Sequence, residues 1–251
     1  MVRRHAGTAF RGAHVFPGGR VDASDGQAAD GSWCEGLDHA VRQLPDLIPS
    51  EAVAFHVAAV RELFEEAGVL LARRPGGGFV SLADDRFGNY RGSVHAGTET
   101  LRSIAEGESL RIALDTLLLF AHWVTPPMPI EGRRFDTRFF MTRVPAGQVP
   151  AHDDRETTDG AWVTPRDAIA RAVQREIVLP PPTWITLREL ERHATVDGAL
   201  AWAAARRVSR REPSIVEEDG ARILVMPVDD GPDPIRYERR FALRDGAWGP
   251  V

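Results

Sequence analysis

The strongest periodic pattern of apolar and polar positions in the chain lies between residues 50 and 67. Apolar side chains recur there at the spacing of one helix face: Val53, Val57, Val60 and Phe64. Ser50 follows a proline and is a suitable N-cap, whereas Gly68 follows the last periodic residue, as a C′ glycine does. The pattern therefore predicts a helix over 50–67 that packs its apolar face inward.

Weaker patterns predict the remaining elements. We expect short helices at 37–44, 165–175, 183–193 and 196–207. Apolar runs and alternation predict strands at 69–72, 123–125, 135–144, 161–163, 223–226 and 236–244. The stretch 84–121 looks helical and irregular, and it could form a cap beside a site on the main helix. Its core-facing series is Leu101, Ile104, Leu110, Leu114 and Leu117.

Composition narrows the class of protein. The chain has 251 residues, 43% hydrophobic and 27% charged, which fits one globular unit with an ample core. No apolar run reaches the roughly 20 residues of a membrane span, and no signal peptide precedes the first motif. A single cysteine, Cys34, excludes an internal disulfide framework and fits a reducing cytoplasm, where we expect the protein to be.

The charged residues give no support for a nucleic-acid partner, and they determine which side chains could bind phosphate. The net charge of −5 gives no reason to expect nucleic-acid binding. All 31 basic residues other than histidine are arginine, so any phosphate-binding site must use guanidinium groups, which bind phosphate well.

Three carboxylates share one face of the predicted main helix. Glu62, Glu65 and Glu66 stand at i, i+3 and i+4, so their like charges repel unless a cation lies between them. Carboxylate oxygens suit Mg²⁺ or Mn²⁺. A solvated acidic face is the alternative. Upstream, Pro17-Gly18-Gly19 forms either an ordinary tight turn or one in which the backbone closely approaches a ligand.

The sequence around these carboxylates resembles a known motif. Residues 61–69 read Arg-Glu-apolar-x-Glu-Glu-x-Gly-apolar, similar to the core of the Nudix box, G-x5-E-x7-R-E-U-x-E-E-x-G-U with U apolar. Together with the glycine turn and Glu156, six residues before Trp162, the chain resembles a Nudix hydrolase over roughly residues 10–175. Within this family, the chain is similar to the branch that contains the peroxisomal coenzyme A diphosphatase and its bacterial relatives. The similarity lies in the split box and in residues 20–22, 59–71, 123–126 and 134–140.

The resemblance implies a fold and a domain plan. We expect an α/β/α sandwich around a mixed β-sheet, with a helical insertion and a C-terminal helical extension, in one domain over 1–251. Arg61 lies forty-two positions after Gly19, where the box has fourteen, so about twenty-eight residues within 23–50 split the box. The helical insert is about 84–121 and the extension about 180–251. Residues 2–4 would end a strand whose earlier part is encoded upstream, and we expect that part to be missing here.

The resemblance also implies an activity and site residues. The activity is metal-dependent hydrolysis of a diphosphate linkage in a nucleoside-diphosphate derivative, foremost coenzyme A or an acyl-CoA. The alternatives are ADP-ribose, a dinucleotide or a nucleoside triphosphate, and a non-catalytic ligand-binding module. Mg²⁺ or Mn²⁺ would be held by Gly19, Glu62, Glu65 and Glu66. Glu66 or Glu156 would act as base, and Arg61 would brace the site.

Several arginines and one histidine are candidates for binding the substrate, and one position departs from the Nudix box. Arg134, Arg138 and His14 are candidates for binding substrate, against the alternative of solvent-facing arginines on a strand. An adenosine 3′-phosphate could meet Arg206, Arg207, Arg210 and Arg211, although a solvated helix end is the alternative. Counted back from Arg61, the first glutamate of the box falls on Val53, so Glu51 or Glu65 would have to pair with Arg61. By analogy, the protein could form a homodimer.

Overall fold

The computed structural model describes residues 1–4, 12–126, 134–152, 157–227, 238–244 and 247–251. The helices are α1 Leu37–Gln43, α2 Pro49–Ala67, α3 Asp85–His95, α4 Leu101–Gly107, α5 Pro165–Val173, α6 Pro181–Leu190 and α7 Val196–Ala205. Two 3-10 turns, Asp25–Asp30 and Leu114–Thr116, accompany them. Among the residues that the structure describes, no helix is long and apolar enough to span a membrane.

The strands form four small sheets. One has the order β2-β1-β8, from β1 Val2–Arg4, β2 His14–Val15 and β8 Thr157–Gly160. A second, β3-β5-β4, joins β3 Cys34–Glu35, β4 Ala72–Arg73 and β5 Arg111–Ala113. The third, β7-β6-β9, joins β6 Leu118–Val124, β7 Asp136–Met141 and β9 Arg210–Arg211. The fourth is an antiparallel meander of β10 Ser214–Glu218, β11 Ala221–Val225, β12 Arg240–Arg244 and β13 Ala247–Pro250. The expected mixed α/β class is confirmed.

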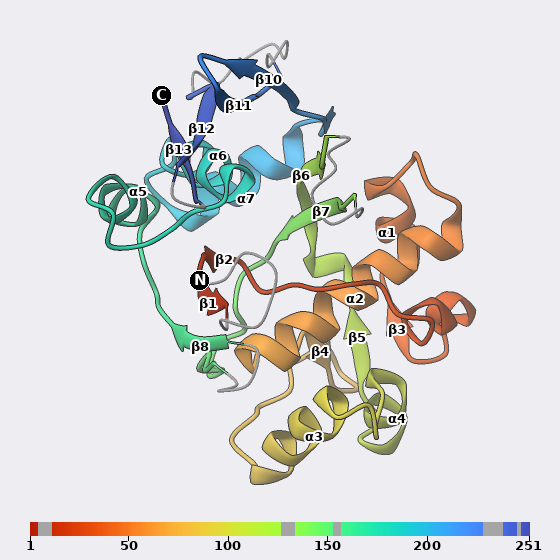
Figure 1. Ribbon diagram of the computed structural model, residues 1–251. Coiled ribbons are helices and arrows are strands. Elements are labelled where there is room, and N and C mark those ends of the chain that lie inside the picture. Colours follow the sequence, from red (N-terminus) through yellow and green to blue (C-terminus); the bar gives the residue numbers. More distant parts are fainter. Residues whose placement is uncertain (5–11, 127–133, 153–156, 228–237, 245–246) are drawn as a thin grey trace.

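Helix α2 lies at the centre of the molecule, with α3 and α4 on one side of it and α5–α7 with β10–β13 on the other (Figure 1). Its predicted apolar face is buried, since Val53, Val57, Val60 and Phe64 are all at most 3% exposed. Gly68 ends the helix at φ 64°, the left-handed conformation expected of a C′ glycine. The prediction of Ser50 as N-cap is wrong, because Pro49 already occupies the first helical turn and Ile48 precedes it.

The described residues form two large apolar cores. One contains Phe64, Leu70 and Leu114 and lies around α2, α3 and β5. The other contains Phe120, Trp184 and Phe241 and lies between β6, the C-terminal helices and the C-terminal sheet. Strand β9 runs parallel to β6 and extends its sheet, which ties the C-terminal extension to the rest of the fold. The division into a single domain stays a prediction.

Several predicted boundaries are wrong for identifiable reasons. The helical interpretation of 84–121 holds only for α3 and α4, because residues 111–113 pair as β5 and 118–124 as β6. Strand β6 is apolar at nearly every position and buried on both faces, which imitates a helical apolar series. The strand expected at 161–163 lies instead at Thr157–Gly160, where the ladder with β1 places it. The extension carries two helices and then a sheet, of which the sequence predicted β11 and β12.

Candidate active site

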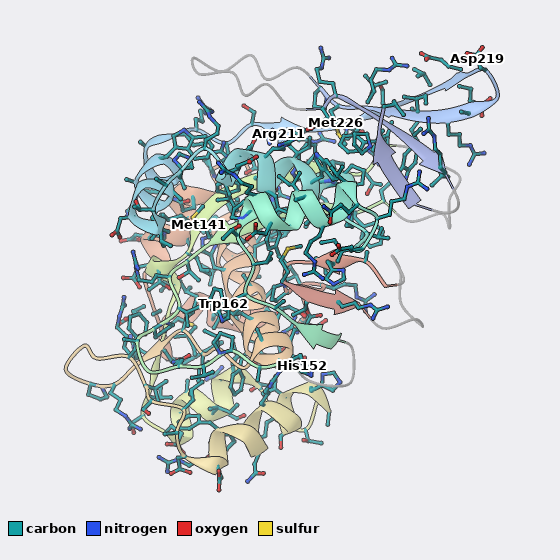
Figure 2. All side chains as sticks on the ribbon, turned by 90° about the vertical axis from the view of Figure 1, so that its left-hand side faces the viewer. Met141, His152, Trp162, Arg211, Asp219 and Met226 are labelled. Atoms are coloured by element: carbon teal, nitrogen blue, oxygen red, sulfur yellow. The ribbon has the colours of Figure 1, made fainter. Side chains whose placement is uncertain are left out.

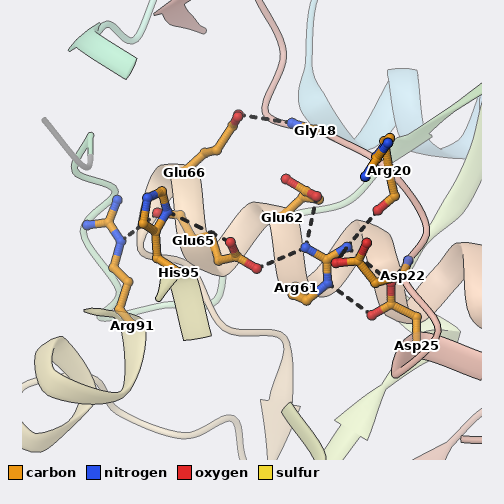
Figure 3. Close-up of polar contacts among 10 residues, drawn as sticks. All are labelled: Gly18, Arg20, Asp22, Asp25, Arg61, Glu62, Glu65, Glu66, Arg91 and His95. Atoms are coloured by element: carbon orange, nitrogen blue, oxygen red, sulfur yellow. Dashed lines mark hydrogen bonds and ion pairs between the residues drawn. The ribbon is translucent and has the colours of Figure 1, made fainter. Parts of the chain in front are cut away.

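Arg61 is the centre of the site and binds both halves of the split box (Figure 3). Its Nε and Nη2 atoms each donate to one oxygen of Asp25 at 3.0 Å. Its Nη1 atom donates to Glu62 and Glu65 at 2.9 Å each, and Nη2 also donates to the carbonyl oxygen of Arg20 at 2.6 Å. Burial alone would lower the pKa of Arg61, but the hydrogen bonds that Arg61 donates to Asp25 and Glu65, together with the negative charges of Asp25 and Glu62, raise this pKa above its ordinary value. Arg61 is therefore a fixed cation that joins α2 to the glycine turn.

Asp25 is the site residue that the sequence analysis missed. Counted forward from Gly19, the acidic position of the box falls six residues on, at Asp25, and this carboxylate is only 2% exposed. The expectation that Val53 had replaced this position is wrong, because the insertion lies after it rather than before it. Of the two substitutes proposed for pairing with Arg61, Glu65 does so, whereas Glu51 is exposed in the first turn of α2. Counting from both ends of the motif would have found Asp25.

The glycine turn touches the carboxylates directly. The backbone N–H of Gly18 donates to Oε2 of Glu66 at 3.0 Å. A Cβ atom at Gly19 would lie 2.3 Å from Oε1 of Glu62, a distance at which atoms collide. A side chain at residue 19 would displace the carboxylate of Glu62, so the glycine lets the turn and this carboxylate lie side by side. The structure thus brings together Gly19, Glu62 and Glu66, as the sequence predicted.

The position of the three glutamates on α2 is electrostatically unfavourable. They lie in the last two turns of α2, which ends at Ala67, and the negative end of a helix dipole disfavours anions. Three like charges at i, i+3 and i+4 add to this cost. Such an arrangement is expected where carboxylates serve to bind a cation.

The donor set fits a hard divalent cation in its chemistry. Glu62, Glu65, Glu66 and the backbone of Gly19 offer only oxygen ligands. Within the described ranges, no group of three acidic, histidine or cysteine side chains is arranged to hold a metal ion. The reason is visible in Figure 3, where Glu66 turns toward Gly18 while Glu62 and Glu65 turn toward Arg61. Binding by all three glutamates would require new side-chain rotamers on the same backbone.

A cleft of about 1750 Å³ opens beside this cluster. Its walls include Gly18, Gly19 and Glu62, then β7, and then the segment after β8 together with α6. Two of its lining side chains are large, aromatic and exposed: Phe135 at 45% and Trp162 at 78% (Trp162 is labelled in Figure 2). Exposed aromatic side chains that gather in one cleft indicate a ligand-binding surface.

The predicted substrate-binding residues lie in different surroundings. Arg138 lines the cleft, but its side chain is 3% exposed, pairs with Asp46 at 2.8 Å and with Asp136, and lies 4.8 Å from the centre of the Phe55 ring. The alternative of a solvent-facing Arg138 is therefore wrong. Arg134 lines the same cleft, is 48% exposed and pairs with Glu212.

Two further candidates are not placed in the cleft. His14 lies on β2 and is absent from the cleft lining, although its neighbours Val15 and Phe16 belong to that lining. Glu156, the candidate base, lies outside the described residues.

The arginines considered for a 3′-phosphate are also engaged elsewhere. Arg206 and Arg211 pair with the fully buried Glu189, at 3.4 Å and 2.6 Å. Arg210 pairs with Glu212 at 2.7 Å. For Arg206 and Arg211, the interpretation as a solvated helix end is replaced by one of structural ion pairs, whereas the pair of Arg210 lies on the surface.

Comparison with known proteins gives the family. A family model described as the NUDT19 Nudix domain matches residues 37–190. The proteins named acyl-coenzyme A diphosphatase NUDT19 from Homo sapiens and Xenopus laevis are 29% and 25% identical to this chain over 87% of its length. The alignments cover 68% and 66% of those two proteins.

A solved structure agrees with this assignment. The crystal structure of a NUDIX hydrolase from Alicyclobacillus acidocaldarius matches with a TM-score of 0.65 and 26% identity, covering 80% of this chain and 86% of that one. Nudix hydrolases generally use divalent metal ions. By sequence and by fold, the chain belongs to the NUDT19 Nudix domain family and is a Nudix hydrolase.

Proposed function

We propose that this protein hydrolyses the diphosphate linkage of coenzyme A or an acyl-CoA, with Mg²⁺ or Mn²⁺ as cofactor. The observation that carries the proposal is the close approach of the Gly18–Gly19 turn to Glu62 and Glu66, on the wall of a large cleft. The names of the human and Xenopus relatives support the choice of substrate. Water would attack one phosphorus, and the P–O–P bond would break to give adenosine 3′,5′-bisphosphate and a phosphopantetheine.

The residues of the Arg61 cluster take separate roles in this proposal. Glu62, Glu65, Glu66 and the Gly19 carbonyl would hold the cation, which supplies Lewis acidity toward the diphosphate and the attacking water. Glu66 or Glu156 would accept the proton of that water. Arg61 would keep Glu62 and Glu65 in place, because its guanidinium group contacts both of them.

The cleft would hold the remainder of the substrate. Phe135 and Trp162 offer exposed aromatic faces on which an adenine ring could stack. Arg134 is exposed at the same cleft and could pair with a phosphate group, whereas Arg138 would act mainly by fixing the cleft wall.

A substrate panel tests this function. The purified protein is incubated with coenzyme A, an acyl-CoA, ADP-ribose, a dinucleotide and nucleoside triphosphates, each with Mg²⁺ or Mn²⁺, and the phosphate products are separated by chromatography. We expect the highest kcat/KM for coenzyme A or the acyl-CoA. A preference for another substrate would reassign the specificity, and absence of turnover with every substrate would favour the non-catalytic ligand-binding module.

A further inference from the structure

Arg91, on helix α3 of the insert, contacts the end of the carboxylate helix. Its Nε atom donates to the backbone carbonyl oxygen of Glu65 at 2.9 Å, and its Nη2 atom donates to the carbonyl oxygen of Ala151 at 2.8 Å (Figure 3 shows the first bond). Its Nη1 atom lies 3.1 Å from where a Cβ atom of Gly68 would be. The guanidinium group therefore joins α2, its C′ residue and the loop after β7.

The carbonyl groups of Leu63, Phe64 and Glu65, near the C-terminal end of α2, each accept a hydrogen bond from outside the helix. Gly68 and Val69 donate to the carbonyls of Phe64 and Leu63, at 3.0 Å and 3.4 Å, which closes the last turn. The carbonyl of Glu65 receives Arg91 instead. A cation at this end of the helix is favourable, because it offsets both the helix dipole and the adjacent carboxylates.

The loop that Arg91 contacts is itself tied to the same region. The N–H of Ala151 donates to the carbonyl of Ala67 at 2.9 Å. The buried side chain of Gln148 accepts from the N–H of Leu70 and donates to the carbonyls of Leu70 and Val80, at 2.9–3.0 Å. Arg91 thus closes a continuous set of bonds between the loop and the end of α2.

A second residue of α3 approaches the side chain of the same glutamate. His95 is one turn after Arg91, and its Nδ1 atom lies 3.9 Å from Oε2 of Glu65. The other oxygen of this carboxylate receives Arg61 at 2.9 Å. The backbone and the side chain of Glu65 are therefore both in contact with α3.

We propose that Arg91 is a positioning residue of the metal site. Through its bond to the Glu65 carbonyl, helix α3 fixes the backbone from which the Glu65 side chain would turn toward the cation. The proposal rests on the proposed function, in which Glu65 is a metal ligand. In this proposal Arg91 acts through Glu65 and is not itself a ligand of the cation or the substrate. Because residues that orient metal ligands commonly change metal affinity by roughly 10-fold to 100-fold, removing Arg91 should weaken cation binding by that amount.

The test is Mn²⁺ binding to Arg91→Gln, measured without substrate from the electron paramagnetic resonance signal of free Mn²⁺. We expect the dissociation constant to rise by roughly 10-fold to 100-fold relative to the parent protein. The matched control is Arg102→Gln, because Arg102 belongs to the same insert and its exposed side chain pairs with Glu106 of its own helix, at 2.8 Å, rather than with α2. Its Mn²⁺ affinity should equal that of the parent.

Further variants separate a positioning role from a loss of folding. If Arg91→Gln does not fold, Arg91→Lys is tested in its place. Lysine keeps the positive charge but lacks the planar guanidinium group that donates to the carbonyls of Glu65 and Ala151 at once. In Arg91→Ala, guanidinium ion added well below unfolding concentrations should restore part of the Mn²⁺ affinity. Parent-like affinity in both Arg91→Gln and Arg91→Lys, with weakened binding in Glu65→Gln, would overturn this inference alone. Parent-like affinity in Glu65→Gln would overturn the proposed metal role of Glu65 as well.

Discussion

Two clusters in this protein are both built from arginine and carboxylate groups, but their excess charges have opposite signs. At the end of α2, the single guanidinium group of Arg61 contacts Asp22, Asp25, Glu62 and Glu65, so negative charge is in excess. In the C-terminal core, the single carboxylate of Glu189 contacts Arg206 and Arg211, so positive charge is in excess.

Their surroundings differ in the same sense. Glu62 of the first cluster lines the open cleft beside a glycine turn that has no side chain to block it. The arginines of the second lie against aromatic rings, with Arg206 4.0 Å from the centre of Trp202 and Arg211 5.2 Å from that of Trp123. The excess charge of the second cluster is thus already accommodated by aromatic faces. The excess negative charge of the first is the charge that the proposed cation would offset, which would distinguish a binding site from a structural one.

The largest effect is expected from Glu65→Gln. It removes the charge of a proposed cation ligand while keeping the shape of the side chain. We expect kcat to fall on the order of a thousandfold, as on loss of one strong electrostatic contact at a reacting group. Far-UV circular dichroism and the midpoint of thermal unfolding should remain close to those of the parent. A near-normal kcat would contradict the claim that the cluster around Arg61 serves the reaction.

The opposite result is expected from Glu189→Gln. Breaking a buried pair leaves two arginines without their carboxylate, which should lower the free energy of unfolding by about 3–5 kcal/mol. Urea denaturation measures this, and kcat per folded molecule should be unchanged. A large loss of kcat in stable, folded protein would mean that the second cluster also serves the reaction.

Asp25 tests whether the split box is complete. Asp25→Asn removes the charge that holds Arg61, and we expect kcat/KM to fall roughly 10-fold to 100-fold. Asp25→Glu, which places a glutamate at the acidic position of the box, should retain most of the activity. Asp22→Asn is the control, because Asp22 is 53% exposed and lies 3.5 Å from Arg61. Equal effects of Asp22→Asn and Asp25→Asn would contradict the assignment of Asp25 to the box.

The smallest effect concerns the opposite face of α2, where His56 is fully buried and binds the carbonyl of Ala52. Burial lowers the pKa of His56 from 6.5 to about 4. The unfolded chain therefore binds the proton more readily, so the stabilisation is present above pH 6.5 and is lost as the pH falls toward 4. Between pH 7 and pH 5 this loss should be about 2 kcal/mol, measured by urea denaturation, and His56→Phe should abolish this part of it. An unchanged pH dependence in the variant would assign the acid sensitivity to other groups.

The sequence predicted the elements that carry their own periodicity. Helix α2 was predicted because its apolar face and its terminal glycine are local features, and the same applies to α5, where Thr164 caps the first turn as expected. Strand β1 was expected at residues 2–4 from the family resemblance, whereas β8 and β9 could not be predicted at their observed positions, since they exist through pairing between segments far apart in the chain. The fate of Arg138 was equally hidden, because Asp46 lies 92 positions away.

The same distinction holds within the candidate site. The spacing of Glu62, Glu65 and Glu66 is local and was visible in the sequence. The contact of Arg61 with Asp25 joins residues 36 positions apart, and that of Arg91 with Glu65 joins residues 26 positions apart. The residues inserted between the two halves of the box hide the pairing of Asp25 with Arg61 from the sequence, although folding brings these two side chains together. The roles assigned to the site residues stay proposals, with Glu156 outside the described part of the chain.

The most direct test of the central claim is the position of Mn²⁺ in crystals soaked with this ion, located by its anomalous scattering. We expect a peak at about 2 Å from carboxylate oxygens of Glu62, Glu65 or Glu66 and near the carbonyl of Gly19. The side chains of Glu62 and Glu65 should have turned from Arg61 toward the ion. A peak elsewhere in a protein whose turnover depends on Mn²⁺, with these glutamates still bound to Arg61 and Gly18, would contradict the account.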